Sequence, residues 1–226
     1  KLVEEYKPKT ISIHFSKAKG EKSEREQEKA DSLAANYSEK RTTSQFVFAT
    51  GLNNVVTAGS VQKSDFRYLG SHFYEWGLTS NTRILRNNNL LHAKYGFSVM
   101  YNNLRATDNR IFVVDKNQTN LEVNSIRQDD SRFKNVNLVF PIHLELDFTK
   151  AEEKDGKTNF KTHNSFRVGL GGYVGTNLKS KQYIKYDADE YKSREVTKGD
   201  YNTTNFIYGL STYIGYKSSS LYLKYD

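Results

Sequence analysis

The chain has no cysteine and only two prolines among its 226 residues. The lack of cysteine excludes disulfide bonds and thiol chemistry. No run of about 18 consecutive apolar residues occurs, which excludes a membrane-spanning helix. It does not exclude a spanning β-barrel, whose short strands need an apolar residue only at every second position. The sequence starts at Lys1 with neither methionine nor a signal region, so we expect a mature or trimmed form.

Aromatic residues supply much of the apolar surface. Only 36% of the residues are hydrophobic, yet there are 16 tyrosines and 13 phenylalanines, a composition that favours strands. The formal net charge is +8, but the charges are dispersed: residues 105–132 carry five basic and five acidic side chains. Dispersed charge lacks the basic patch that nucleic acids require, so we expect no nucleic-acid partner.

Hydrophobicity alternates with a period of two from residue 44 onward. The clearest case is VNLVFPIHLELDF, residues 136–148, in which every second residue is large and apolar. Such long alternation predicts a strand. Six further segments alternate in the same way, namely 46–52, 74–79, 91–102, 166–178, 205–216 and 221–225. The sequence therefore predicts an all-β, up-and-down antiparallel barrel with seven visible strands.

The glycines of FRVGLGGYVG, residues 166–175, resemble a loop that binds a dinucleotide phosphate. That fingerprint requires a third glycine where this chain has Val174, and no helical pattern follows. We therefore assign these glycines to a strand and expect no cofactor and no metal.

The volume of the side chains predicts which face of the sheet points inward. The interior of an eight-stranded barrel is just wide enough for side chains to fill, and the large apolar set is too bulky for it. The opposite face holds glycine, alanine and serine, and its few long polar residues can pair across the lumen, as buried charges must. The predicted lumenal polar network is Glu75, Arg83, Lys94, His143, Glu145, Asp147 and Arg167.

Outward-facing apolar groups then match lipid. Aromatic residues at the two membrane interfaces are typical of outer-membrane barrels, and the candidates here are Tyr68, Tyr74, Trp76, Tyr95, Tyr101, Tyr208 and Tyr216.

The lengths of the connections support a membrane barrel. The first, third and fifth links between strands, 54–67, 105–133 and 179–204, are long, whereas the second, fourth and sixth links are shorter. Outer-membrane barrels show this alternation of long external loops and short periplasmic turns. Strand-like runs inside the last two long links predict projecting hairpins. We divide the chain into a charged periplasmic segment, 1–43, containing a short strand and a helix or tether, and an outer-membrane barrel, 44–226.

Seven strands leave an open edge, which is unfavourable in lipid. We expect an eighth strand after Asp226. The alternatives are closure by residues 10–15, and a larger or oligomeric barrel.

The segments FVFATGLNNV, HAKYGFSVMYNNL and FRVGLGGYVG resemble small outer-membrane β-barrel proteins of Gram-negative bacteria, of the OmpA and OmpX barrel class, and the barrel domains common in Bacteroidota. The resemblance covers about residues 44–226. It implies fold and location, but members range from anchors to enzymes to subunits of envelope machines, so it implies no activity.

The strongest catalytic candidates are His143, Glu145 and Asp147, which share one strand face. Such a row can activate a water or hold a metal, but a lumenal network needs the same residue types. At the outer rim, His72 lies near Ser71 and Glu75. We expect a non-enzymatic structural or interaction role in contact with outer-membrane lipid or lipopolysaccharide and with other envelope proteins. The alternatives are an enzyme that modifies lipid A or cleaves proteins, and a narrow channel.

Overall fold

The computed structural model describes residues 41–55, 64–85, 88–154, 157–188 and 191–226. The predicted segment 1–43 lies almost wholly outside these residues, so its helix or tether and its short strand stay predictions. The regular structure of the described residues is entirely β-strand. They include no helix of the length and hydropathy needed to cross a membrane.

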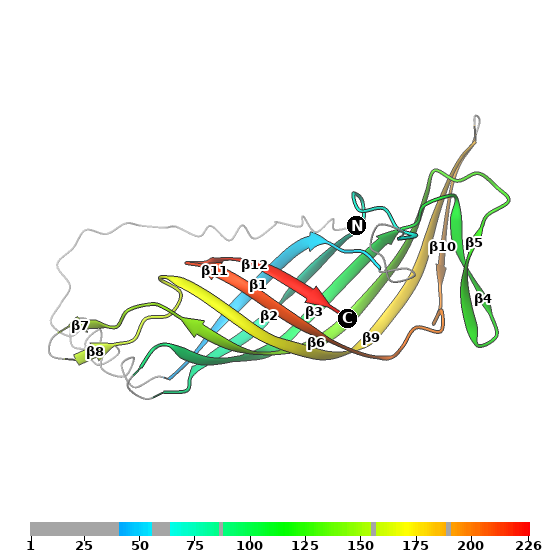
Figure 1. Ribbon diagram of the computed structural model, residues 1–226. Coiled ribbons are helices and arrows are strands. Elements are labelled where there is room, and N and C mark those ends of the chain that lie inside the picture. Colours follow the sequence, from blue (N-terminus) through cyan, green and yellow to red (C-terminus); the bar gives the residue numbers. More distant parts are fainter. Residues whose placement is uncertain (1–40, 56–63, 86–87, 155–156, 189–190) are drawn as a thin grey trace, which may run out of the picture. The chain divides into compact units, whose positions relative to one another are not determined.

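The described residues form twelve strands (Figure 1). They are β1 (Thr42–Leu52), β2 (His72–Arg83), β3 (Leu91–Arg105), β4 (Arg110–Asp115), β5 (Gln118–Val123), β6 (Asp130–Asp147), β7 (Glu152–Lys154), β8 (Lys157–Asn159), β9 (Phe166–Ala188), β10 (Tyr191–Lys198), β11 (Phe206–Tyr216) and β12 (Ser219–Tyr225).

The main sheet is a curled antiparallel meander (Figure 1), in which seven strands follow the order β1-β2-β3-β6-β9-β11-β12 and β10 adds to β9. The predicted all-β antiparallel class and the count of seven strands are confirmed. Both projecting hairpins are confirmed as well, as β4 with β5 and as the outer part of β9 with β10. A short β7–β8 hairpin was not expected. Within the described residues, β1 pairs only with β2 and β12 only with β11.

The two ends of this sheet differ. We call the end that carries the β4–β5 and β9–β10 hairpins the hairpin end. The other end, where short connections join β2 to β3 and β11 to β12, is the turn end.

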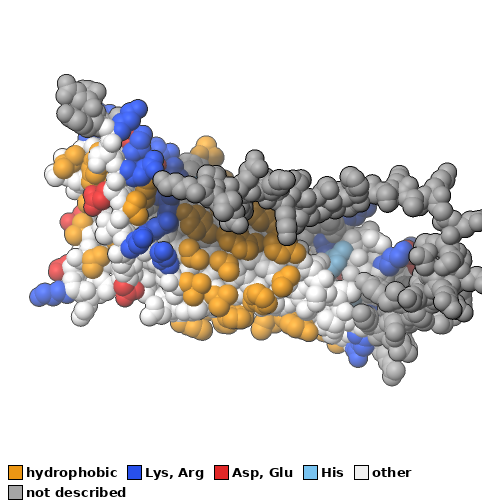
Figure 2. All heavy atoms as spheres, turned by 180° about the vertical axis from the view of Figure 1, so that it is seen from behind, with side chains coloured by type: hydrophobic (Ala, Val, Ile, Leu, Met, Phe, Trp, Pro, Cys, Tyr) orange, Lys and Arg blue, Asp and Glu red, His pale blue; other side chains and the backbone are white. Residues whose placement is uncertain are grey.

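Large apolar side chains point away from the concave face. On the outer face, the exposed fraction is 59% for Leu144 and 69% for Leu170. Glu145, the next residue after Leu144 on β6, points to the concave face and is fully buried. A band of hydrophobic side chains is visible across one side of the molecule, with basic side chains gathered beside it (Figure 2). The sheet is therefore polar inside and apolar outside, the reverse of a water-soluble β-barrel.

A β-bulge on β9 changes this alternation. Val136 of β6 lies opposite Lys179, and Asn137 lies opposite Asn177, so Leu178 is the extra residue. A bulge shifts every following side chain to the other face. Ser180 and Gln182 consequently become buried, whereas Lys179 is exposed.

Aromatic rings cover the hairpin end of the concave face. The Phe112 ring lies 4.7 Å from that of Phe133, which contacts Tyr201 at 5.4 Å, centroid to centroid. The Gln182 side chain fixes β4 in place: its Oε1 accepts a bond from Phe112 N (2.6 Å), and its Nε2 donates to Phe112 O (3.1 Å). The β4–β5 hairpin is thus bonded over the end of the sheet.

Candidate functional site: a buried polar cluster on the concave face

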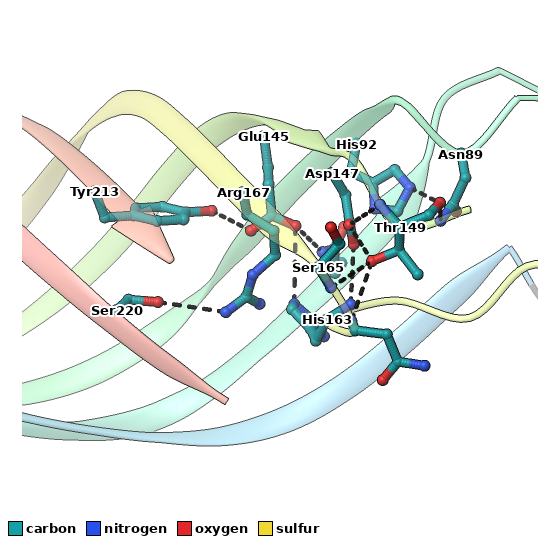
Figure 3. Close-up of polar contacts among 12 residues, drawn as sticks. Asn89, His92, Glu145, Asp147, Thr149, His163, Ser165, Arg167, Tyr213 and Ser220 are labelled. Carbon is teal, nitrogen blue, oxygen red and sulfur yellow. Dashed lines mark hydrogen bonds and ion pairs between the residues drawn. The ribbon is translucent and has the colours of Figure 1, made fainter. Parts of the chain in front are cut away.

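Glu145 is the centre of a hydrogen-bonded cluster near the turn end (Figure 3). Asn81 Nδ2 donates to its Oε1 (2.6 Å), and the Tyr213 hydroxyl donates to its Oε2 (2.5 Å). His163 Nε2 lies 3.8 Å from Oε1. The two hydrogen-bond donors come from β2 and β11, and His163 comes from the β8–β9 connection, so this one carboxylate lies among segments far apart in the sequence.

The Tyr213 ring needs the glycine that faces it. A Cβ on Gly169 of β9 would collide with that ring. The small residues on this face therefore make room for long polar side chains from neighbouring strands, as the volume argument predicts.

Asp147 ties the loop after β6 to the sheet. Its Oδ1 accepts bonds from Thr149 N (2.9 Å) and Thr149 Oγ1 (2.5 Å), and its Oδ2 accepts one from His163 N (3.0 Å). Thr149 Oγ1 in turn accepts a bond from Ser165 N (3.1 Å). These bonds therefore hold the residues before and after the β7–β8 hairpin against the turn end of the sheet.

His92 is fully buried beside the two carboxylates. The Asn89 amide nitrogen donates to the carbonyls of Thr149 (3.0 Å) and Lys161 (2.7 Å). Its oxygen is left to accept a bond from His92 Nε2 at 3.2 Å. This arrangement assigns the proton to Nε2 and leaves Nδ1 of a neutral imidazole as an acceptor.

A second polar group lies farther along the concave face. Glu75 accepts hydrogen bonds from Ser98 Oγ (2.5 Å) and from Lys224 Nζ (2.8 Å). The Glu75 and Lys224 side chains are only 8% and 11% exposed, so this is a buried ion pair. It joins β2, near one edge of the sheet, to β12 at the other.

The remaining polar side chains also bond within the concave face. His143 Nε2 lies 2.7 Å from Ser211 Oγ, Lys94 Nζ lies 4.7 Å from the centroid of the Tyr213 ring, and Arg167 Nη2 donates to Lys217 O (2.6 Å). A cavity of about 440 Å³ separates them from the inner side of β1. Its lining includes residues of both β1 and β12, the two strands that have no mutual pairing.

The cluster fits a hydrogen-bonded plug better than a metal centre. Ligand atoms of His92, Glu145 and Asp147 lie within 4.8 Å of one another. However, each of the four carboxylate oxygens already accepts a bond from a protein donor. A metal would therefore have to compete with these donors for the carboxylate oxygens, whereas His92 Nδ1 is buried and has no hydrogen-bond partner.

The structure brings the predicted lumenal residues to one face, with partners that the sequence did not reveal. Six of the seven are buried, and Lys94 is half-buried. No hydrogen bond or ion pair between two of the seven is found in the described part of the chain. Their partners include Asn81, Ser98, Thr149, Tyr213 and Lys224.

The catalytic candidates assemble only in part: Glu145 and Asp147 lie close together, but the histidine beside them is His92 and not His143. His143 bonds to Ser211 rather than to Glu145. At the hairpin end, His72 and Glu75 lie on opposite faces of β2: His72 contacts Tyr74 on the outer face, whereas Glu75 is buried on the concave face. Ser71 Oγ accepts a bond from Arg105 N. Ser71, His72 and Glu75, the rim group suggested by the sequence, therefore do not form one site.

The predicted interface aromatics lie at the surface. Tyr101 is half-buried against Tyr74, with ring centroids 6.5 Å apart. The other six are exposed, namely Tyr68, Tyr74, Trp76, Tyr95, Tyr208 and Tyr216.

Sequence reasoning missed the contributions of His92 and His163. Neither is among the candidate residues predicted from the sequence. The alternation of β3 puts His92 on the same face as Lys94, which is a usable signal. Nothing in the sequence around His163 indicates that its loop folds back onto Asp147.

Comparison of the chain with protein-family models, with curated proteins and with solved structures gave no match. The class is therefore defined by the fold and the site alone: a curled antiparallel β-sheet with an apolar outer face and a polar, hydrogen-bonded concave face.

Proposed function

We propose that this chain is an integral outer-membrane β-barrel with a non-enzymatic structural or interaction role. One observation carries the proposal: large apolar side chains cover the outer face while Glu145, Asp147 and Arg167 are buried on the concave face. Exposed apolar surface on this scale is unfavourable in water. In lipid it is the expected outer wall of a barrel.

The contents of the concave face favour a plugged barrel over a channel or an enzyme. Glu145 and its partners occupy one end, beside the cavity lined by β1 and β12, and the rings of Phe112, Phe133 and Tyr201 cover the other. Each carboxylate oxygen of Glu145 and Asp147 accepts a hydrogen bond from a protein donor. The projecting hairpins β4–β5 and β9–β10 are then the surfaces that would engage a partner outside the membrane.

Trp76 provides a test of the outer wall, because it is the only tryptophan of the chain and its exposed fraction is 42% on the outer face of β2. We expect brominated phospholipids to quench its fluorescence strongly when the full-length protein is reconstituted in vesicles. Acrylamide in the aqueous phase should quench it weakly.

A matched control moves the tryptophan to the aromatic rings that cover the hairpin end of the concave face. In the double variant Trp76→Phe/Phe112→Trp, bromine should have little effect, since residue 112 belongs to the β4–β5 hairpin and its ring packs against Phe133 on the concave face. Strong acrylamide quenching of Trp76, with no bromine effect, would contradict the proposal.

We further propose that one more strand completes the barrel between β12 and β1. Neighbouring strands are about 4.8 Å apart, so an intervening strand would separate β1 from β12 by about 10 Å. A disulfide needs Cα atoms about 4.4–6.8 Å apart. Because the chain has no cysteine, engineered pairs give a clear result.

We expect no disulfide between Leu223→Cys and any of the outward positions Ser44, Phe46, Phe48 and Thr50 changed to cysteine. The pair Thr212→Cys/Leu223→Cys is the positive control, because these residues are direct partners on β11 and β12. Gel mobility before and after reduction reads out the bond. A bond from position 223 to β1 would show that seven strands close the barrel directly.

A further inference from the structure

Basic side chains from three strands form a continuous surface on the outer face at the hairpin end. Lys134 of β6 lies directly opposite Lys181 of β9, and Lys181 lies directly opposite Lys198 of β10. Direct partners on neighbouring strands share a face and lie about 5 Å apart. With two neighbours, Lys179 and Arg194, they form what we call the basic surface.

The β-bulge at Leu178 creates this surface. Without the extra residue, Ser180 and Gln182 would take the outward positions that Lys179 and Lys181 now occupy. The cations are separated in the sequence by up to 64 positions, from 134 to 198, and acidic residues lie between them. Counting charge along the chain therefore gave no sign of it.

Like charges directly opposite one another destabilise a sheet, so the row Lys134–Lys181–Lys198 is unfavourable on its own. Two acidic groups close to Lys134 in the sequence are already engaged: Asp130 contacts Arg105 (2.7 Å) and Arg132 (2.6 Å), and Asp129 contacts Lys185 (3.2 Å). For the five residues of the basic surface, the described part of the chain supplies no ion pair.

Two of these cations converge on one ring. Lys134 Nζ lies 4.9 Å from the centroid of Tyr183, and the Arg194 guanidinium lies 5.5 Å from it. The charges are held together rather than spread apart, as in sites that bind an anion.

The basic surface adjoins the apolar wall. Two residues after Lys134 the outer face of β6 becomes apolar at Val136 and Leu138, and Leu178 immediately precedes Lys179. A ligand that spans this boundary needs an anionic head and hydrocarbon chains. A soluble anion would use only the first of these features.

We propose that the basic surface binds the phosphate groups of a phosphorylated membrane lipid while its acyl chains lie on the wall below. This inference rests on the proposed function, because it places the surface at the height of the lipid headgroups. Its chemistry is charge-assisted bonding of ammonium and guanidinium groups to phosphate oxygens.

The test compares three probes on the full-length protein in detergent micelles: diphosphoryl lipid A, the same glycolipid without phosphates, and inorganic phosphate. We expect native mass spectrometry to show tight binding of the first only. The variant Lys134→Gln/Lys181→Gln should bind it about 30-fold more weakly, from the usual contribution of a lysine near an anionic lipid surface. Higher salt should weaken wild-type binding.

A control variant removes the same charge elsewhere. Lys150→Gln/Lys217→Gln lies at the turn end and should bind like wild type. Without lipid, Lys134→Gln/Lys181→Gln should be at least as stable to urea as wild type, because an opposed pair of like charges is gone. A loss of stability in that variant would assign the lysines a structural role and overturn the inference.

Equal binding by both variants, or binding of the dephosphorylated glycolipid, would also overturn the inference. Binding of inorganic phosphate as tightly as lipid A would replace it with a soluble phosphate site. These outcomes are distinguishable from failure of the proposed function: if bromine quenches Trp76 and the variants bind equally, only the lipid site is wrong.

Discussion

We expect Glu145→Ala to lower the free energy of unfolding by about 4 kcal/mol, since hydrogen bonds to a buried charge contribute about 1.5–3 kcal/mol each. The substitution leaves the Asn81 amide and the Tyr213 hydroxyl without their acceptor. Both donors are buried: Asn81 is 1% exposed and Tyr213 is 5% exposed. Urea unfolding of the full-length protein from vesicles measures the change.

Two variants make this result interpretable. Glu145→Gln keeps an acceptor for Asn81 and should cost less than alanine. Glu122→Ala removes an exposed carboxylate from β5, and its effect should stay within about 0.5 kcal/mol. If Glu145→Ala and Glu122→Ala were equally mild, the buried cluster would not hold the strands together.

The period of two predicted most of the fold because it responds to one strong constraint, the difference between the two faces of a sheet. It separates exposed Leu144 from buried Glu145 on β6, and exposed Leu170 from its neighbours on β9. The pattern does not depend on the partner strands, so a single sequence is enough. The same reasoning found both hairpins, whose strands alternate on either side of a polar turn.

What the sequence did not predict depends on register and on loops. The bulge at Leu178 is one extra residue, and nothing local distinguishes it from the alternation around it, yet it brings Lys181 opposite Lys134. His163 reaches the cluster only because its loop folds back beneath the turn end. The alternation of residues 205–216 puts Tyr213 on the less apolar face, but its bond to Glu145 crosses from β11 to β6 and requires the curl of the sheet.

The outer face yields the second large effect. We expect Ile142→Arg to lower the free energy of unfolding from vesicles by about 3 kcal/mol, because a cation on the lipid face costs about 2–4 kcal/mol at the middle of a bilayer. Ile142 is 64% exposed and lies midway along the apolar row of β6, from Val136 to Leu146. Its partners Tyr95 and Gly172 offer no anion.

Depth separates this effect from ordinary damage to a strand. Thr42→Arg places the same cation on the outer face of β1 at the turn end, where the surface is already polar, and should cost at most about 1 kcal/mol. In water both variants would be close to neutral, since an exposed isoleucine loses nothing when a charge replaces it. If Ile142→Arg left the free energy of unfolding unchanged, this face would not contact lipid. A loss of stability that is larger at position 142 than at position 42 requires a hydrocarbon layer around the sheet.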